Sequence, residues 1–287
     1  MSGGFPQGIE RKNFQYGGAS TGSTGNSLTS GATIGAIGAY TTIVASTAYD
    51  AAWLDLMMNS YSAGAHAGTY TYSVTLAVGS VGNEVPFASD IVYDCPTSSG
   101  HAQHFEFPVN IPAGSRISAA LRSFASATTD FLNVAVELSD SPLSGIQGFS
   151  GHLDTYGFNT TTMIGAAVDP GGTINTPGAY TQITASLTND IAGFLIGIDN
   201  QGNLGAGFNG MYLVDIATGA AASEVIFLPK LQLSRSNFGP PIIESPPYFG
   251  PIFRSIPAGT RVAIRAQSSM NTATYRVFGA TLYGIRA

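Results

Sequence analysis

Hydrophobic and polar residues alternate along much of the chain with a period of two. In residues 70–78, YTYSVTLAV, an apolar side chain stands at every second position. Successive side chains of a β-strand point to opposite faces of the sheet, so this pattern predicts a strand with one buried face. The same alternation or similar apolar spacing predicts further strands over residues 116–122, 131–138, 211–217, 261–266 and 275–285.

The segments between these strands contain clusters of Gly, Pro, Asn and Ser about every 8–12 residues, the spacing typical of a sandwich or jelly roll. No stretch keeps a helical period over three turns. Residues 49–60, YDAAWLDLMMNS, are the best helical candidate, but the matching residues 189–200 contain Gly193 and Gly197 among β-branched residues. Both segments are therefore predicted to be strands, and the fold class to be all-β.

The strongest sequence signal is an internal repeat. Residues 38–52 recur as residues 178–192, 140 positions later, with nine of fifteen residues identical. At the same spacing, YSVTLAVG at 72–79 is matched by YLVDIATG at 212–219. Matched blocks in the same order indicate a duplication, and a repeated unit of this length predicts two domains of one fold.

A third block, IPAGSR at 111–116, recurs as IPAGTR at 256–261, now 145 positions later. The five additional residues must therefore lie between Val225 and Ile256. In the block, Pro suits the entrance of a strand and Gly suits a tight turn, so Pro112 and Pro257 are expected in equivalent turns. The residues assigned to this structural repeat are Pro112, Arg116, Pro257, Arg261, Asp50 and Asp190.

Carboxylates recur with the same spacing as the rest of the repeat. Asp50 is matched by Asp190, and Glu84 by Glu224. We expect one carboxylate in each copy to pair with the arginine of the IPAG block or to close a turn.

The repeat and the composition together predict the domain boundaries. Residues 1–30 are rich in Gly, Ser and Thr and are expected to form a flexible N-terminal arm. The first β-sandwich is expected over 31–140 and the second over 173–287. Residues 141–172 between them are predicted to form a connector.

The low content of charged residues and the negative net charge limit the classes of partner that the chain is expected to bind. Only 10% of residues are charged, against roughly 25% in typical soluble proteins, and the net charge is −6. Nucleic-acid binding requires a positive surface, so no nucleic-acid partner is predicted. The uncharged run 27–49 is long enough for a membrane span. Its Gly, Ser and Thr content and its partial recurrence in the second half predict a strand instead, so no membrane partner is expected.

The single cysteine, Cys95, excludes an intrachain disulfide and a Cys-based zinc site. The N-terminal sequence MSGGFPQGIERKNF lacks the apolar core of a signal peptide. No cofactor is expected.

Only one cluster has metal-ligand residue types. His101 and His104 lie downstream of Asp94. Residues three apart on a strand point to opposite faces, so the two histidines would converge only if the preceding loop curls. The second copy contains no histidine. We predict no metal site, with His101, His104 and Asp94 as weak candidates.

Catalytic motifs are likewise weak. Ser150, His152 and Asp154 have the residue types of a catalytic triad, but they are close only in sequence, in a Gly-rich segment without a nucleophile elbow. The stretch 202–207, GNLGAG, lacks the strand and helix of a nucleotide-binding loop. The chain is therefore predicted not to be an enzyme.

The segment 238–253 carries five prolines and several aromatic residues. A stiff apolar loop loses little entropy on binding, so it suits an interface, although it could equally cap the end of a sandwich. The predicted interface residues are Phe238, Pro240, Tyr248, Phe249 and Phe253.

In the blocks GAYTQITASLTNDIAGFLIGI, MYLVDIATGAAASEVIFLP and IPAGTRVAIRAQSS, the sequence resembles surface structural proteins of tailed bacteriophages. Such proteins serve as head decorations, collar fibres and tail appendages. The resemblance implies a non-enzymatic virion component, made in the host cytoplasm and bound to other capsid or tail proteins. It further implies a homo-oligomer, with a trimer favoured and the N-terminal arm as anchor.

Two other functions stay open on the sequence. A glycan-binding adhesin or receptor-binding tail protein would use Trp53 or the tyrosines to stack on host surface sugars. An enzyme would require His101 and His104 to be organised around a metal ion.

Overall fold

The computed structural model describes residues 13–16, 25–59, 70–95, 102–124, 131–140, 150–199, 210–235 and 248–287. Eighteen strands and one helical turn make up this part of the chain, which confirms the all-β prediction. The strands of the first half are β1 Asn13–Tyr16, β2 Asn26–Thr29, β3 Thr41–Val44, β4 Ala51–Asn59, β5 Tyr70–Val78, β6 Val85–Cys95, β7 Ala102–Ile111, β8 Ile117–Ser123 and β9 Phe131–Ser139.

The second half repeats this order strand for strand. Its elements are β10 Leu153–Tyr156, β11 Ala166–Val168, β12 Thr181–Thr184, β13 Ile191–Asp199, β14 Gly210–Thr218, β15 Val225–Arg235, β16 Tyr248–Ile252, β17 Val262–Ser268, α1 Ala273–Arg276 and β18 Phe278–Arg286. Residues 51–59 form β4, so the segment with helical character is a strand, as predicted.

Each half is a sandwich of two sheets. In the first half, β1, β9, β4 and β7 form one sheet, with β2 also on β9, and β6, β5, β8 and β3 form the other. The alternating side chains of these strands meet in one apolar core that includes Leu56, Val74, Phe107 and Leu121. In the second half, β16, β13, β18 and β10 form one sheet, with β11 also on β18, and β12, β17, β14 and β15 form the other. Its core includes Phe194, Ile216, Ile264 and Phe278.

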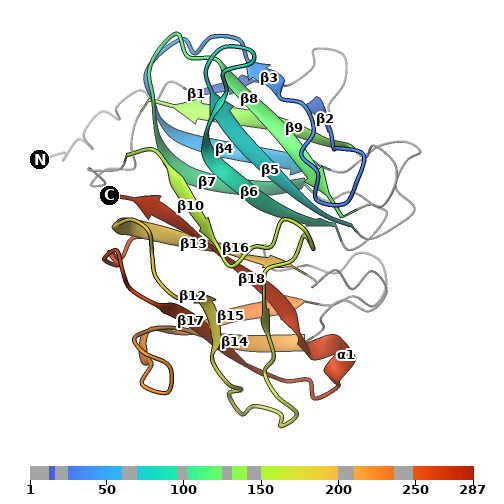
Figure 1. Ribbon diagram of the computed structural model, residues 1–287, viewed down its shortest axis with the longest axis vertical. Coiled ribbons are helices and arrows are strands. Elements are labelled where there is room, and N and C mark those ends of the chain that lie inside the picture. Colours follow the sequence, from blue (N-terminus) through green and yellow to red (C-terminus); the bar gives the residue numbers. More distant parts are fainter. Residues whose placement is uncertain are drawn as a thin grey trace, which may run out of the picture.

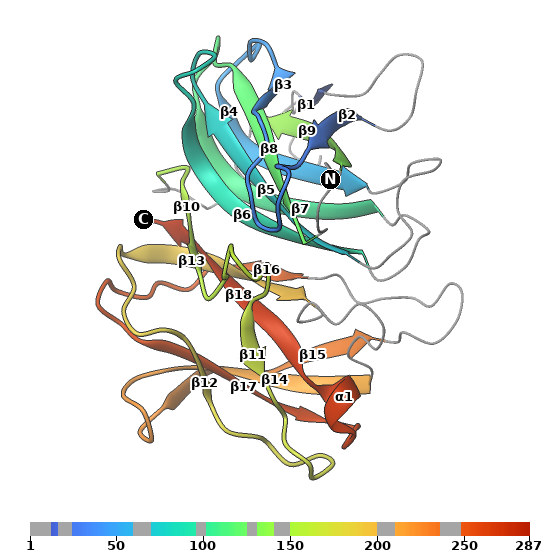
Figure 2. The ribbon, with the colours of Figure 1, turned by 45° about the vertical axis from the view of Figure 1, so that its right-hand side comes forward.

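The two sandwiches share one continuous sheet. The short strand β10 pairs antiparallel with β18 of its own sandwich and parallel with β6 of the first, where Leu153 stands opposite Ala88. This contact joins one sheet of each half into a nine-stranded sheet in the order β16-β13-β18-β10-β6-β5-β8-β3, with β11 on β18. Figures 1 and 2 show the sheet β16-β13-β18-β10 between the first sandwich and the remaining sheet of the second.

The predicted boundaries require correction at two points. Strands β1 and β2 pair with β9 and lie within the predicted arm 1–30. Strands β10 and β11 pair with β18 and lie within the predicted connector 141–172. These strands are three or four residues long, which is too short to show alternation, and β1 and β10 keep the 140-residue spacing of the repeat. The repeated unit therefore begins at β1 and at β10.

The last strand also begins later than expected. Tyr275 and Arg276 belong to the helical turn α1, and β18 begins at Phe278. The Arg276 guanidinium donates to Asp169 at 2.7 Å and to the Asn271 carbonyl at 2.7 Å, which holds the turn against the start of the second copy. No helix in the described ranges has the length and apolar character needed to cross a membrane.

Candidate functional site

The repeated residues hold the same turn in both sandwiches. Asp50 Oδ1 accepts the Ala113 amide at 2.7 Å, and Asp190 Oδ1 accepts the Ala258 amide at 2.7 Å. Each of these amides directly follows the proline of its block, Pro112 or Pro257. In both turns the Gly two residues after the proline has a positive φ, 82° and 79°, which other residues rarely adopt. Pro112 and Pro257 therefore occupy equivalent turns.

The arginine of each block ties three strands together. Arg116 forms an ion pair with Glu84 at 3.1 Å, and Arg261 forms the same pair with Glu224 at 3.1 Å. Each guanidinium also donates to a glycine carbonyl, that of Gly79 at 2.9 Å in the first copy. Partial burial would raise the pKa of Glu84, but hydrogen bonds from two backbone amides and Arg116 outweigh it and lower that pKa.

These repeated groups therefore stabilise turns and strand ends. The two copies also differ from each other in places. The largest difference lies in the outer face of the sheet formed by β4 and β9 in the first copy and by β13 and β18 in the second.

In the second copy this face is apolar and packs on the first sandwich. Leu195 and Tyr283 stand opposite each other on β13 and β18, and both are buried in the core cluster of the first half. The Tyr283 ring meets Phe105 edge to face, with centroids 5.1 Å apart. A Cβ on Gly197 would lie 2.8 Å from the Tyr283 ring, so glycine is needed for the ring to lie across β13.

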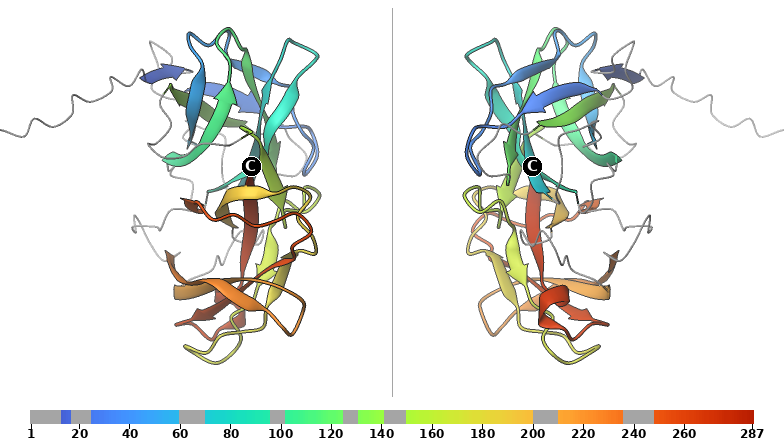
Figure 3. Two further views of the ribbon diagram at one scale, coloured as in Figure 1. Left: turned by 90° about the vertical axis from the view of Figure 1, so that its left-hand side faces the viewer. Right: turned by 90° about the vertical axis from the view of Figure 1, so that its right-hand side faces the viewer.

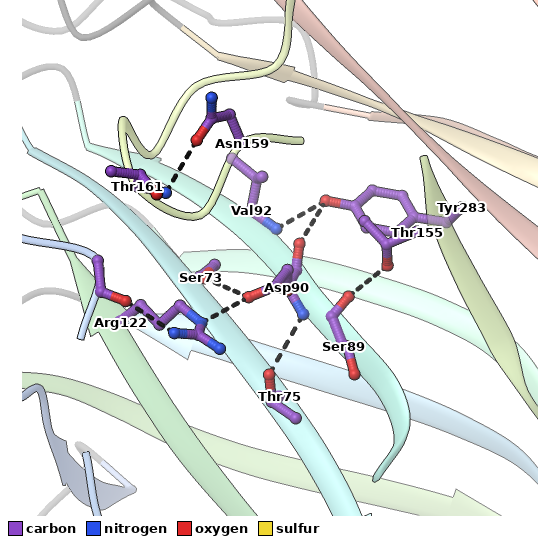
Figure 4. A network of polar contacts seen from close by, with 11 residues as sticks. Ser73, Thr75, Ser89, Asp90, Val92, Arg122, Thr155, Asn159, Thr161 and Tyr283 are labelled. Carbon is purple, nitrogen blue, oxygen red and sulfur yellow. Dashed lines mark hydrogen bonds and ion pairs between the residues drawn. The ribbon is translucent and has the colours of Figure 1, made fainter. Parts of the chain in front are cut away.

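Polar contacts fix the register of the two sandwiches at the same interface (Figure 4). The Tyr283 hydroxyl donates to the Asp90 carbonyl at 3.0 Å and accepts the Val92 amide at 2.8 Å. The Thr155 hydroxyl donates to the Ser89 carbonyl at 2.5 Å. Burial raises the pKa of Tyr283 well above its ordinary value, so the phenol stays protonated and can donate.

The strand that receives Tyr283 contains a bulge, present in both copies. Asp90 and Lys230, 140 positions apart, both have a positive φ, 54° and 53°. The bulged amide donates to the Thr75 hydroxyl at 3.3 Å in the first copy and to the Asp215 carboxylate at 3.0 Å in the second. In the first copy the side chain of Asp90 pairs with Arg122 at 3.0 Å. The bulge is thus a property of the fold, while the residue that occupies it differs.

In the first copy, the corresponding sheet face is polar. We call it the front face and define it by Trp53, Asp55, His104, Glu106 and Glu137. Asp55 stands opposite Glu106 on β7 and Glu137 on β9, so three carboxylates form a row across three strands. The His104 Nδ1 lies 2.7 Å from Asp55 Oδ2, while Asp55 Oδ1 is buried without a hydrogen-bond partner among the described residues.

In the second copy, described side chains at the end equivalent to the one that receives Tyr283 are more exposed than in the first copy. We call this surface the back end and define it by Phe227, Lys230, Phe249, Phe253 and Arg254. Phe227 occupies the position of the buried Phe87 but is only half-buried, and Phe253 is 42% exposed. The Arg254 guanidinium lies over the Phe227 ring, 5.0 Å from its centroid, and donates to the Phe227 carbonyl.

The predicted interface residues fall partly on this back end. Phe249 lies on β16 opposite Ile196, and Phe253 follows the strand. Phe238 and Pro240 lie outside the described residues, and only the backbone of Tyr248 is described. The prediction that these five residues form an interface stays a prediction.

The predicted metal candidates are not brought together by the described structure. His101 lies outside the described residues, only the backbone of Asp94 is described, and His104 contacts Asp55. Within the described ranges, no group of three His, Cys, Asp or Glu side chains could hold a metal ion.

The segment that contains Ser150, His152 and Asp154 makes structural contacts with the final strand. The Asp154 carboxylate pairs with Arg286 at 2.5 Å and accepts from Asn189 at 2.8 Å. The His152 carbonyl accepts the Arg286 amide at 3.1 Å. These contacts attach the start of the second copy to its final strand, whose C-terminal end lies near the junction of the two sandwiches (Figure 3).

Comparisons with known proteins give no family. No protein-family model and no curated protein matches the chain. Among solved structures, the N-terminal CBM22-1–CBM22-2 tandem domain of Paenibacillus barcinonensis Xyn10C is similar over 97% of this chain and 92% of its own. The sequences are 11% identical and the TM-score is 0.26.

Proposed function

We propose that the chain is a non-enzymatic structural subunit of a phage virion, a head decoration or fibre-like surface protein. The observation that carries this proposal is the union of two sandwiches through one sheet and the buried Tyr283 contact. Domains of one chain move relative to one another unless the interface between them is large and hydrophobic. A tandem whose second half completes the core of its first half suits a part that must keep its shape.

The polar groups of the chain support the same proposal. Asp50 and Asp190 close turns, Asp90 pairs beside a bulge, and Asp154 anchors the final strand. Each of these carboxylates has a partner that holds one part of the backbone to another. Such use of charge favours a structural role over acid–base chemistry, which requires a titratable group beside a cavity.

The proposal includes the expected partners, which are other capsid or tail proteins and further copies of the chain. A trimer is the favoured oligomer. Anchoring is assigned to residues 1–12, ahead of β1, because β1 and β2 belong to the sheet. Removing residues 1–12 should leave the fold intact and abolish attachment to particles, whereas removing residues 1–30 should also destabilise the first sandwich.

The test is sedimentation of the purified full chain with phage particles produced without it. Co-sedimentation of the chain, saturable and competed by unlabelled chain, supports a virion subunit. Failure to bind particles, together with absence of the chain from purified complete virions by mass spectrometry, would refute it.

A glycan-binding adhesin is a second candidate, favoured by one observation on the front face. The half-buried Trp53 lies on the same outward face of β4 as Asp55, beside a row of carboxylates. An aromatic ring next to hydrogen-bond acceptors can stack on a sugar and bind its hydroxyls. Binding of the chain to a glycan array, lost in Trp53→Ala but kept in the control Tyr40→Ala, would support this function.

A further inference from the structure

We propose that the interface between the two sandwiches is repeated between chains, with the front face of one chain docking on the back end of the next. This inference does not depend on the proposed virion role. The partner is a second copy of the same chain, and the contact is head to tail rather than two-fold.

The geometry of the duplication supplies both halves of the contact. Each sandwich has an outer sheet face, centred on β4 or β13, and an end between β6 and β7 or between β15 and β16. Within one chain, the face of the second copy covers the end of the first copy (Figure 2). Among the described residues, no second sandwich lies against the face of the first copy or against the end of the second copy. The same rotation and translation, applied again, would bring them together between two chains.

The front face and the back end carry opposite charges at positions where the internal interface has an uncharged contact. In the internal interface, Tyr283 of the face meets the backbone of Asp90 at the end. At the equivalent positions, the front face carries Glu137, which stands opposite Asp55 as Tyr283 stands opposite Leu195. The back end carries Lys230 in the bulge where the first copy has Asp90.

A second charge match accompanies the first. The front-face row of Glu106, Asp55 and Glu137 brings like charges together on adjacent strands, which destabilises an isolated sheet. The back end offers Arg254, which contacts Phe227 on β15, the strand that also carries Lys230. A cationic partner would relieve the repulsion in the row.

The apolar side chains at the back end are also less buried than their equivalents in the first copy. In β6, Phe87 and Ala88 are 4% and 0% exposed, and both belong to the core cluster that Leu195 and Tyr283 of the second copy join. In β15 the equivalent Phe227 and Leu228 are half-buried, and the nearby Ile226 is 38% exposed. These side chains would become buried if a front face docked there.

The edge of β15 limits how tight the contact can be. Pro229 and Lys230 stand in the middle of this edge strand, and both residues discourage uncontrolled strand pairing. Docking must therefore depend on side chains and charge rather than on an extended ladder. We expect weak, salt-sensitive association in solution that is reinforced where many copies are held together on one surface.

The test is sedimentation of the full-length chain over a range of concentrations, with the charge reversals Glu137→Lys and Lys230→Glu. The unmodified chain should form concentration-dependent head-to-tail oligomers that dissociate at high salt. Each single variant should weaken association by at least about tenfold, the effect of 1.4 kcal/mol. Asn83→Lys, at an exposed turn, is the control and should behave as the unmodified chain.

Mixing the two variants separates a head-to-tail contact from a general effect of net charge. The front face of the Glu137→Lys variant has a charge opposite to that of the back end of the Lys230→Glu variant. An equimolar mixture should therefore regain association, and so should a chain carrying both reversals. Circular dichroism must show that each variant is folded. A monomer at every concentration, or an oligomer unaffected by either reversal, would overturn the proposal. Neither result would bear on whether the chain sediments with phage particles.

Discussion

The Tyr283 hydroxyl of the second sandwich donates a hydrogen bond to the carbonyl of Asp90 in the first, across 193 residues of chain and a distance of 3.0 Å. The same oxygen accepts the Val92 amide. Because the phenol is buried, loss of either hydrogen bond leaves a polar group without water to replace it. The contact therefore couples the stability of one sandwich to that of the other.

Tyr283→Phe should destabilise the chain by about 1–3 kcal/mol, because the Val92 amide and the Asp90 carbonyl lose a buried partner while the ring still packs on Phe105. Chemical denaturation followed by circular dichroism checks this, and the transition should broaden or split as the two sandwiches uncouple. Tyr40→Phe is the matched control and should change stability by less than about 0.5 kcal/mol. Equal effects of the two substitutions would contradict the role of the Tyr283 hydroxyl.

Alkaline pH should act on the same group. The pKa of Tyr283 is raised above 10.0 by burial. The unfolded chain therefore releases this proton at a lower pH than the folded chain. The stabilisation is fully present below pH 10.0 and decreases as pH rises above that value. The free energy of unfolding, measured at pH 8 to 11, should fall less steeply above pH 10 in Tyr283→Phe. Parallel curves for the two proteins would argue against a buried, protonated phenol.

Gly197→Ala should destabilise the interface by about 1–3 kcal/mol, because the added methyl group would lie 2.8 Å from the Tyr283 ring. The specific check is a double-mutant cycle. In a Tyr283→Ala background the cost of Gly197→Ala should largely disappear, since the ring that it displaces is gone. Additive effects would show that the glycine serves another purpose.

The two repeated ion pairs should contribute similarly to stability. Arg116→Ala and Arg261→Ala each leave a poorly exposed glutamate without its guanidinium, and each should lower the midpoint of thermal unfolding by about 4–8 °C. Arg276→Ala is the comparison, because its partner Asp169 is 51% exposed, and the midpoint should fall by about 2 °C or less. Thermal unfolding of the three variants distinguishes these values. A large effect at only one of the repeated arginines would mean that the copies no longer use the pair alike.

Much of the fold could be predicted from the residues that both copies retain. The IPAG blocks, Asp50 and Asp190 recur because turns and strand ends impose the same geometry on each sandwich, and their spacing exposes the duplication. Strands β1, β2, β10 and β11 could not be predicted because three or four residues carry no period, and their place is set by hydrogen bonds to distant strands. Sequence similarity between the copies is low there.

The interface could not be predicted from conserved spacing, because it lies where the copies diverge. Tyr283 and Leu195 occupy the outward positions held by Glu137 and Asp55 in the first copy. A position-by-position comparison of the repeats gives the usable signal. An apolar residue in one copy and a carboxylate in the other, on the same outward face, indicates that one face is covered and the other is not.

The most direct test of the joined tandem is amide hydrogen exchange at Val92, whose N–H donates to the Tyr283 hydroxyl. If the sandwiches form one body, this amide should exchange as slowly as those in the core strands, and Tyr283→Phe should accelerate it by at least about tenfold. Exchange at the rate of an exposed strand edge in the unmodified chain, with no change in Tyr283→Phe, would mean that the two sandwiches do not form one body.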